Sequence, residues 1–180
     1  MECKICRACG NELKDTFADL GMSPLSNSYI KPENLQNKEV YYPLHAYVCP
    51  ECFLVQLEEF ESPESIFTDY AYFSSYSSSW LEHVSKYADM MISKLNLGAD
   101  SKVIEIASND GYLLQFFDVK GIPVTGIEPA KNVAVEAEKK GIHTIKDFFG
   151  VRLATDLKND KVEADLLIAN NVLAHVPDIN

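Results

Sequence analysis

The sequence predicts an α/β protein in which a small cysteine-rich domain leads into an incomplete Rossmann-like parallel sheet. Two observations carry this prediction. Two Cys-x-x-Cys pairs precede residue 53, and from residue 101 onward short runs rich in Val, Ile and Leu alternate with helical segments. Alternation of this kind is typical of right-handed crossovers and of a parallel sheet covered on both faces.

The composition excludes several classes of protein. With 47% hydrophobic and 24% charged residues, the 180-residue chain can bury a core, so disorder is not expected. The net charge of -11, with no local Lys/Arg cluster, repels phosphate backbones, and we expect no nucleic-acid partner. Neither a signal peptide nor a run of roughly 18 apolar residues is present, so we expect no membrane partner and a cytoplasmic location.

The chain divides into three predicted parts. Residues 1–65 hold the cysteines and most of the prolines, and the likeliest strands there are 41–49 and 53–60. Residues 66–98 are an aromatic and serine tract followed by a connecting helix. Residues 99–180 carry four predicted strands. They cover 101–107, 123–128, 141–147 and 164–170, with helical segments at 110–120 and 130–141 between them.

The helix of the middle part has predicted ends and a predicted apolar face. Ser79 and Glu82 have the spacing of a capping box, and Leu97-Gly98 indicates the end. Apolar residues recur every three to four positions and form one face of this helix. They are Trp80, Val84, Tyr87, Met91 and Leu95.

The cysteines predict a structural zinc site. In Cys6-x-x-Cys9 and Cys49-x-x-Cys52 a two-residue spacing lets both thiolates of a pair face one ion, and four thiolates close a tetrahedral shell around Zn²⁺. In a reducing compartment such pairs are metal ligands rather than disulfides. Because no position stays open for water or substrate, the site would be structural, and it would staple a region whose own core is small.

Cys3 leaves an alternative, because Cys3 and Cys6 also form a Cys-x-x-Cys pair. We favour Cys6 and Cys9, since Gly10 directly after them permits the tight turn of a knuckle, and Cys3 is then a spare thiol. An iron–sulfur cluster and ordinary buried cysteines are the other interpretations.

Polar residues follow each predicted strand of the sheet. In an open parallel sheet, ligands bind beyond the carboxyl ends of the strands, at the switch point beside the first strand. Glu128 follows Gly111 by 17 residues, a position suited to accepting hydrogen bonds from a ribose diol. The four strand ends carry Glu105 to Gly111, Glu128-Pro129, Asp147-Phe148-Phe149 and Asn170-Asn171.

The first of these loops predicts the chemistry of the ligand. A dinucleotide pyrophosphate would need a glycine-lined helix N-terminus, yet the loop has Gly111 alone beside Glu105, Asn109 and Asp110. Two acids and an amide suit a polar, cationic end, and S-adenosylmethionine (SAM), with an ammonium, a sulfonium and no phosphate, fits. Two interpretations compete with ligand binding: Asp110 can be a helix N-cap and Glu105 a strand-end acid. His175 is either a pocket residue or a satisfied histidine after the fourth strand.

Together these pieces resemble the deoxysugar C-methyltransferases, which combine a zinc-binding N-terminal domain, a class I SAM domain and a C-terminal domain. The resemblance spans nearly the whole chain in the family's order. The matching stretches are CRACG with CPECFLVQL, DYAYFSSYSSSWLEH, EIASNDGYLL, GIEPA, KDFF and NNVLAHVPDI.

The resemblance implies methyl transfer from SAM to a ring carbon next to the ketone of a nucleotide-linked 4-keto sugar. Tyr72 would lie on the substrate side, or it is one more aromatic residue of a packed tract. The resemblance assigns the remaining roles to residues at the strand ends. Those expected at the methionine end of SAM are Glu105, Ala107, Asn109, Asp110 and Gly111. Glu128 and Pro129 are expected at the ribose, Asp147 and Phe148 at the adenine, and Asn170, Asn171 and His175 in the rest of the pocket.

Two departures from the family qualify this expectation. Ala107 stands where the usual loop has its first glycine. The family's catalytic histidine lies beyond the SAM domain, and a class I sheet has seven strands where residues 101–180 provide four. We therefore expect an N-terminal portion of a longer enzyme, inactive alone, whose fourth strand could self-associate. A stop codon directly after Asn180 would contradict this.

Two other functions remain open from the sequence. One is a zinc-dependent protein-interaction module. The other is an NAD-dependent oxidoreductase, which Glu128 favours and which the missing G-x-G-x-x-G opposes.

Overall fold

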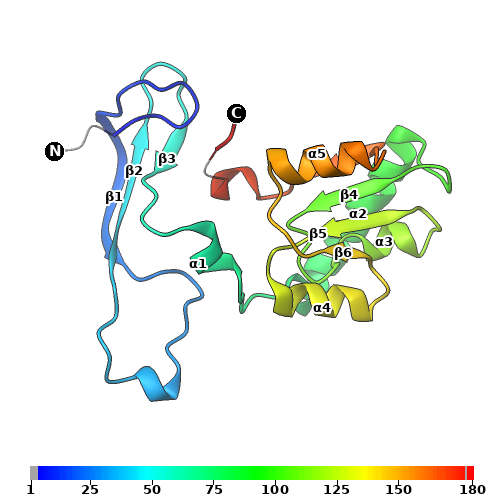
Figure 1. The fold of residues 1–180 in the computed structure, drawn as a ribbon, viewed down its shortest axis with the longest axis horizontal. Helices are drawn as coiled ribbons and strands as arrows, with labels where there is room; N and C mark the ends of the chain where they lie inside the picture. The colour runs from blue at the N-terminus through cyan, green and yellow to red at the C-terminus, as the bar shows by residue number, and fades with distance from the viewer. Residues whose placement is uncertain (1–3, 177) are drawn as a thin grey trace. The chain divides into compact units, whose positions relative to one another are not determined.

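The computed structural model describes residues 4–176 and 178–180, so Cys3 lies outside the described residues. The chain forms two compact units (Figure 1). The first contains residues up to Ile66 together with Leu173–Asn180, and the second is Phe67–Val172. Each unit has its own sheet.

The first unit is built on a three-stranded antiparallel sheet in the order β1-β2-β3. The strands are β1 (Asp15–Ser23), β2 (Tyr42–Val48) and β3 (Val55–Leu57). β2 and β3 fall within predicted strands, whereas β1 was not predicted. The short helical elements are η1 (Pro32–Asn34), α1 (Pro63–Phe67, which ends at the start of the second unit) and η3 (Leu173–His175).

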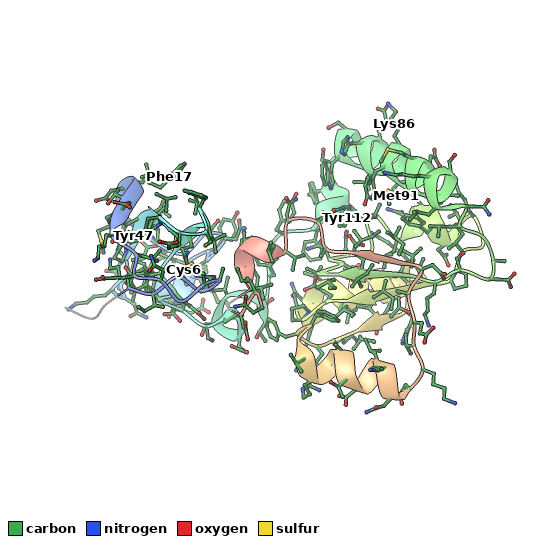
Figure 2. All side chains as sticks on the ribbon, turned by 90° about the horizontal axis from the view of Figure 1, so that it is seen from above. Cys6, Phe17, Tyr47, Lys86, Met91 and Tyr112 are labelled. Carbon is green, nitrogen blue, oxygen red and sulfur yellow. The ribbon has the colours of Figure 1, made fainter. Side chains whose placement is uncertain are left out.

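The core of the first unit is small. Its buried cluster consists of Cys6, Leu13, Tyr47 and Cys49. Many apolar side chains of β1 stay exposed, among them Phe17, which is 64% exposed (Figure 2). Because two of the four residues in this cluster are cysteines, the burial of apolar side chains contributes little to the stability of this unit.

The second unit contains the parallel sheet that the sequence predicts. Its order is β6-β5-β4-β7, and all neighbours pair in parallel. The strands are β4 (Val103–Ile106), β5 (Val124–Ile127), β6 (Thr144–Ile145) and β7 (Leu166–Ile168). The direction of strand addition reverses at β4, which makes the carboxyl end of β4 the switch point. β7 lies at a sheet edge and exposes Leu167.

Helices cover both faces of this sheet (Figure 1). On the face of Val103, α2 (Ser78–Leu95) and α3 (Gln115–Asp118) form the larger core, to which Ala137 of α4 (Lys131–Lys139) also contributes. On the face of Ile104, α5 (Val151–Asn159) packs through Leu153. The middle part predicted as a connecting helix is thus packed into the core of the second unit through Val84 and Ala88 of α2.

The ends of α2 differ from the prediction. Ser77, not Ser79, is the N-cap, and its hydroxyl accepts a hydrogen bond from the amide of Trp80. The helix ends at Asn96 in the left-handed conformation (φ 52°), two residues before Gly98. Asparagine tolerates this conformation because its short amide side chain bonds locally. Leu95, predicted on the apolar face, is 42% exposed.

The helix predicted over residues 110–120 is also shorter than expected, because turns occupy residues 110–114 and α3 begins at Gln115. A separate finding concerns membranes. Within the residues that the structure describes, no helix combines the length and the apolar character needed to cross a bilayer.

Candidate functional site

The four predicted zinc ligands come together in the first unit. The sulfurs of Cys6, Cys9, Cys49 and Cys52 all lie within 4.8 Å of one another. The Sγ atoms of Cys6 and Cys52 are 3.5 Å apart, as are those of Cys9 and Cys49. A tetrahedral zinc site with Zn–S bonds of about 2.3 Å has edges of about 3.8 Å, so the donor set fits Zn²⁺.

Backbone amides surround these sulfurs, as the knuckle prediction requires. Burial opposes ionisation of Cys6, but the amides of Cys9 and Ala8 and the side chain of Gln56 lower its pKa to about 6. The amides of Cys52 and Glu51 likewise lower the pKa of Cys49. Both low-pKa thiols are thus prepared to bind a cation as thiolates.

The other two thiols shift in the opposite direction. The amide of Asn11 lowers the pKa of Cys9, but the neighbouring Cys49 sulfur and burial outweigh it and raise that pKa to about 12. The pKa of Cys52 is also raised, where burial and the Cys6 and Cys49 sulfurs outweigh the amide of Leu54. Four thiolates this close repel one another, and a divalent cation offsets that repulsion.

The two knuckles make the same turn with different residues. Gly10 follows the first pair at φ 74°, and its amide donates to the Cys6 carbonyl. Phe53 occupies the equivalent position of the second knuckle at φ 62°, with its amide donating to the Cys49 carbonyl. The turn is therefore required by the knuckle, and glycine is not.

Gln56 is a residue of the metal centre that the sequence analysis missed. Its Nε2 donates to the Cys6 sulfur at 3.2 Å, and its Oε1 accepts from the Arg7 amide at 3.0 Å. It is 8% exposed. A buried amide that contacts both a ligand sulfur and the knuckle backbone orients the ligand. A polar residue in the apolar run FLVQL of β3 was the available signal.

In the second unit, the loop after β4 has an unusual backbone. Ala107, Asn109 and Gly111 have φ angles of 53°, 50° and 75°. Ala107, which stands where the usual loop has its first glycine, thus adopts the left-handed conformation that favours glycine. Gly111 is also sterically constrained, since a Cβ there would lie 3.1 Å from Ile142.

Three acids are buried around this loop. Glu105 is 1% exposed, Asp110 3% and Glu128 5%. Burial, and then the charges of Glu128 and Asp110, raise the pKa of Glu105 well above its usual value, although the hydroxyl of Tyr112 opposes the shift. Burial and Glu105 in turn raise the pKa of Tyr112. Tyr112, which lies beside α2 (Figure 2), was not predicted as a site residue.

Buried acceptors in this cluster lack partners. Within the described part of the chain, Oε2 of Glu105, Oδ1 of Asp110 and the Ser108 hydroxyl are buried without a hydrogen bond. Unpaired buried acceptors are costly, and they are expected where a ligand supplies the donor. A cationic or donor-rich ligand fits this end of the sheet, and a phosphate does not.

Glu128 is partly engaged by the backbone. Its Oε2 accepts from the amide of Asn109 at 2.9 Å, and its Oε1 accepts from that of Ala130 at 2.8 Å, so the carboxylate spans the β4 and β5 loops. Burial raises the pKa of Glu128, and the hydrogen bonds from these two amides only partly offset this shift. Each carboxylate oxygen retains a second lone pair, so the predicted contact with a ribose is compatible with this geometry. Pro129 is partly buried next to it.

Asp147 and Phe148 follow β6. One carboxylate oxygen of Asp147 accepts from the Phe148 amide at 2.8 Å, and the other pairs with Arg152. The Arg152 guanidinium lowers the pKa of Asp147. Both predicted adenine-side residues are partly buried.

The last three predicted residues, Asn170, Asn171 and His175, are exposed. Asn170 and Asn171 are exposed in the turn after β7, and Asn171 has φ 57°. His175 is exposed in η3, which is grouped with the first unit. The structure thus gathers residues 105–111 and Glu128 into one cluster of the second unit, whereas His175 belongs to the first unit.

The fold and the two clusters define a class of protein. A four-cysteine knuckle domain precedes a Rossmann-type sheet whose switch point carries buried acids. Residues 6–67 match the profile of a family described as a putative zinc binding domain. The chain is also 30% identical to the C-methyltransferase NovU of Streptomyces niveus over 175 residues, which is 97% of this chain and 42% of that protein. These matches confirm the resemblance to a methyltransferase with a zinc-binding N-terminal domain, and the chain spans less than half the length of this relative.

Solved structures match over shorter stretches. The MccD protein covers 46% of this chain and 29% of its own length at 17% identity, with a TM-score of 0.27. YjhP of E. coli covers 43% of this chain and 33% of its own length at 14% identity, with a TM-score of 0.31. At these scores neither structure carries an argument about this chain.

Proposed function

We propose that this chain is the zinc-binding and SAM-binding part of a C-methyltransferase that acts on a nucleotide-linked 4-keto deoxysugar, next to the ketone. The observation that supports this most is the 30% identity to a C-methyltransferase along 97% of the chain. The acid cluster at the switch point supports the choice of cofactor, because its orphaned acceptors suit an ammonium-bearing ligand.

The residues of this chain would bind and orient the cofactor. Asp110 and the β4 loop would receive the methionine end, Glu128 the ribose, and Asp147 with Phe148 the adenine. When bound, SAM supplies an electrophilic methyl group. Tyr72, which is 51% exposed, would meet the sugar. Methylation beside a ketone also needs a base for the proton alpha to the carbonyl and in-line alignment of carbon and methyl. We assign that base to the part of the protein that corresponds to the rest of the relative.

The zinc centre would be structural in this function. Its four ligands are thiolates, so no coordination position is open for a substrate. Its role would be to hold the first unit folded, and the carbon–carbon bond would form without it.

A labelling experiment tests the reaction. The zinc-loaded protein, extended through its reading frame, is incubated with methyl-labelled SAM and a nucleotide-linked 4-keto deoxysugar. We expect label on the carbon next to the ketone and, in D₂O without SAM, exchange of the proton on that carbon. Label on an oxygen or nitrogen atom would contradict the proposal.

A matched pair of variants tests the cofactor site. Asp110→Asn removes the charge of a 3%-exposed acid, and Asp118→Asn removes that of an exposed acid at the end of α3. We expect the first to raise the dissociation constant of S-adenosylhomocysteine about tenfold, which corresponds to about 1.4 kcal/mol, and the second to leave it unchanged. Equal affinities would remove Asp110 from the site.

A further inference from the structure

Residues 70–75 of the second unit, here called the strap, contact the loop after β4 (residues 107–111), here called the cofactor loop. They lie between α1 and α2, and η2 (Ser74–Tyr76) begins within them. The aromatic side chains of the strap are at most half-buried, since Tyr70 and Phe73 are half-buried and Tyr72 is 51% exposed. Polar contacts therefore contribute much of what holds the strap in place.

The first contact is a two-way pairing with Asn132 of α4. The Tyr70 amide donates to Oδ1 of Asn132 at 3.1 Å, and Nδ2 of Asn132 donates to the Tyr70 carbonyl at 2.8 Å. One side chain thus satisfies both backbone groups of one residue, as a neighbouring strand would.

Asn109 of the cofactor loop makes a second pairing of the same kind. Its Oδ1 accepts from the Ser74 amide at 2.8 Å, and its Nδ2 donates to the Tyr72 carbonyl at 3.1 Å. Its own amide is bound to Glu128. The Asn109 side chain, predicted to face the cofactor, is therefore committed to the strap.

A third set of contacts involves Lys140 and Asp110. Nζ of Lys140 donates to the Ser75 hydroxyl at 2.7 Å, to the Asp110 carbonyl at 2.8 Å and to Oδ2 of Asp110 at 3.2 Å. The Ser75 amide also donates to Oδ2 of Asp110, at 3.3 Å. The same acid that has an orphaned oxygen for a ligand thus binds the strap with its other oxygen.

We infer that Asn132, Asn109 and Lys140 are positioning residues that fasten the strap to the cofactor loop and thereby fix the phenol of Tyr72 relative to the cofactor. The ring of Tyr72 meets that of Tyr70 edge-on at 6.4 Å, so the Asn132 pairing supports Tyr72 directly. This inference rests on the proposed function, which places Tyr72 at the substrate.

Cofactor binding and strap order are coupled in this arrangement. Asn109 and Asp110 belong to the loop and also hold the strap, so a ligand that orders the loop orders the strap. By reciprocity, the ordered strap strengthens ligand binding by the same factor by which the ligand favours the ordered strap, so a variant that loosens the strap weakens binding of the ligand. Because hydrogen bonds rather than a packed core hold it, the strap can open while the second unit stays folded.

Hydrogen exchange of the strap amides with and without S-adenosylhomocysteine tests the inference. Asn132→Ala removes both Tyr70 contacts, and Lys131→Ala is the control on the same helix, since no hydrogen bond to the strap is described for Lys131. We expect Asn132→Ala to speed exchange at Tyr70, Ser74 and Ser75 together, about tenfold, and to weaken S-adenosylhomocysteine about fivefold. Lys131→Ala should change neither, and the unfolding midpoint reported by Trp80 should stay the same in both.

Two further results sharpen the test. Asn132→Asp keeps the acceptor for the Tyr70 amide, so it should restore part of the protection and part of the affinity. Saturating S-adenosylhomocysteine should slow strap exchange in the unaltered protein. Faster exchange at Tyr70 alone, or equal affinity of the Asn132→Ala and Lys131→Ala proteins, would overturn the inference.

The failure of the proposed function gives a different result. If the unaltered protein and Lys131→Ala both bind no S-adenosylhomocysteine, the cofactor proposal fails and the coupling fails with it. Exchange measured without ligand still decides whether the strap is fastened as one segment. Binding that leaves strap exchange unchanged overturns the inference alone.

Discussion

The two units of this chain differ in what stabilises the fold of each. The first buries four residues in its main cluster, and two of them are cysteines. The second buries apolar side chains on both faces of its sheet, with Leu113, Leu114 and Phe117 fully buried. From this difference we expect the stability of the first unit to depend on the metal and that of the second to depend on the hydrophobic effect.

Removing a zinc ligand should have the largest effect, and it should be confined to the first unit. Cys49→Ser takes away a fully buried thiolate. Structural zinc contributes about 10–16 kcal/mol of binding free energy in small zinc-finger peptides, so we expect loss of zinc and unfolding of residues 4–66. Trp80, the single tryptophan, lies in the second unit and should keep its native fluorescence.

Cys3→Ser is the matched control for that measurement. Because Cys3 is predicted not to bind zinc, the Cys3→Ser protein should keep one zinc ion per chain. Metal analysis and circular dichroism give the readout. A Cys49→Ser protein that retains zinc would contradict the four-thiolate site, and so would loss of zinc from Cys3→Ser.

A large-to-small change in the second unit should have the next largest effect. Phe117→Ala opens a cavity in the larger core, and we expect the free energy of unfolding to fall by about 3–5 kcal/mol. Phe17→Ala, at an exposed residue of β1, should change the free energy of unfolding of the second unit by less than about 0.5 kcal/mol. Urea denaturation followed by Trp80 fluorescence measures the first, and the zinc content of both proteins should stay at one. Loss of zinc from Phe117→Ala would show that the units are not independent.

A glycine in the sheet tests how closely the cofactor loop packs. A Cβ on Gly126 of β5 would lie 2.4 Å from the Ser108 hydroxyl. We expect Gly126→Ala to cost about 1–3 kcal/mol of unfolding free energy, as overpacking does. Gly150→Ala, where no atom lies within 4 Å of the added Cβ, is the control. Adding Ser108→Gly should restore most of the loss, and failure to do so would place the strain elsewhere.

The buried acid of β4 should make the second unit less stable as pH rises. The pKa of folded Glu105 is raised above its usual value of about 4.5, chiefly by burial. Above that value the unfolded chain loses the proton first, so the free energy of unfolding falls as pH rises toward the folded pKa. Each unit of pKa difference corresponds to about 1.4 kcal/mol.

Glu105→Gln should reduce this fall and leave the part that comes from the raised pKa of Glu128, and Glu163→Gln, at an exposed glutamate, should keep the whole of it. Denaturation at a series of pH values from about 4.5 upward gives the slope. An equal slope in both variants would mean that another group titrates.

The sequence predicts the parts of the fold that depend on local chemistry. The spacing of Cys6, Cys9, Cys49 and Cys52 is sufficient for the metal centre because each pair forms its own turn. Alternation of apolar runs and helices is sufficient for the parallel sheet. β1 escaped prediction because its sequence, DTFADLGMS, lacks a clear alternation and it leaves most of its side chains exposed.

The remaining parts depend on contacts between distant residues. Asn96 ends α2 ahead of Gly98 because either residue tolerates the left-handed conformation, and the sequence does not say which is used. Asn109 and Glu105 stay predicted cofactor residues, but the sequence did not show that the Asn109 side chain also holds the strap or that Glu105 also contacts Tyr112. Lys140 and Asn132 could not be found, since the strap residues that they bind lie more than 60 positions away.

Isothermal titration of the zinc-quantified protein with S-adenosylhomocysteine, with NAD as the parallel ligand, tests the central claim most directly. We expect one zinc per chain, binding of S-adenosylhomocysteine and no binding of NAD. Binding of NAD, or no binding of S-adenosylhomocysteine by a folded and zinc-loaded protein, would contradict the assignment of the acid cluster at the end of β4 as a SAM site.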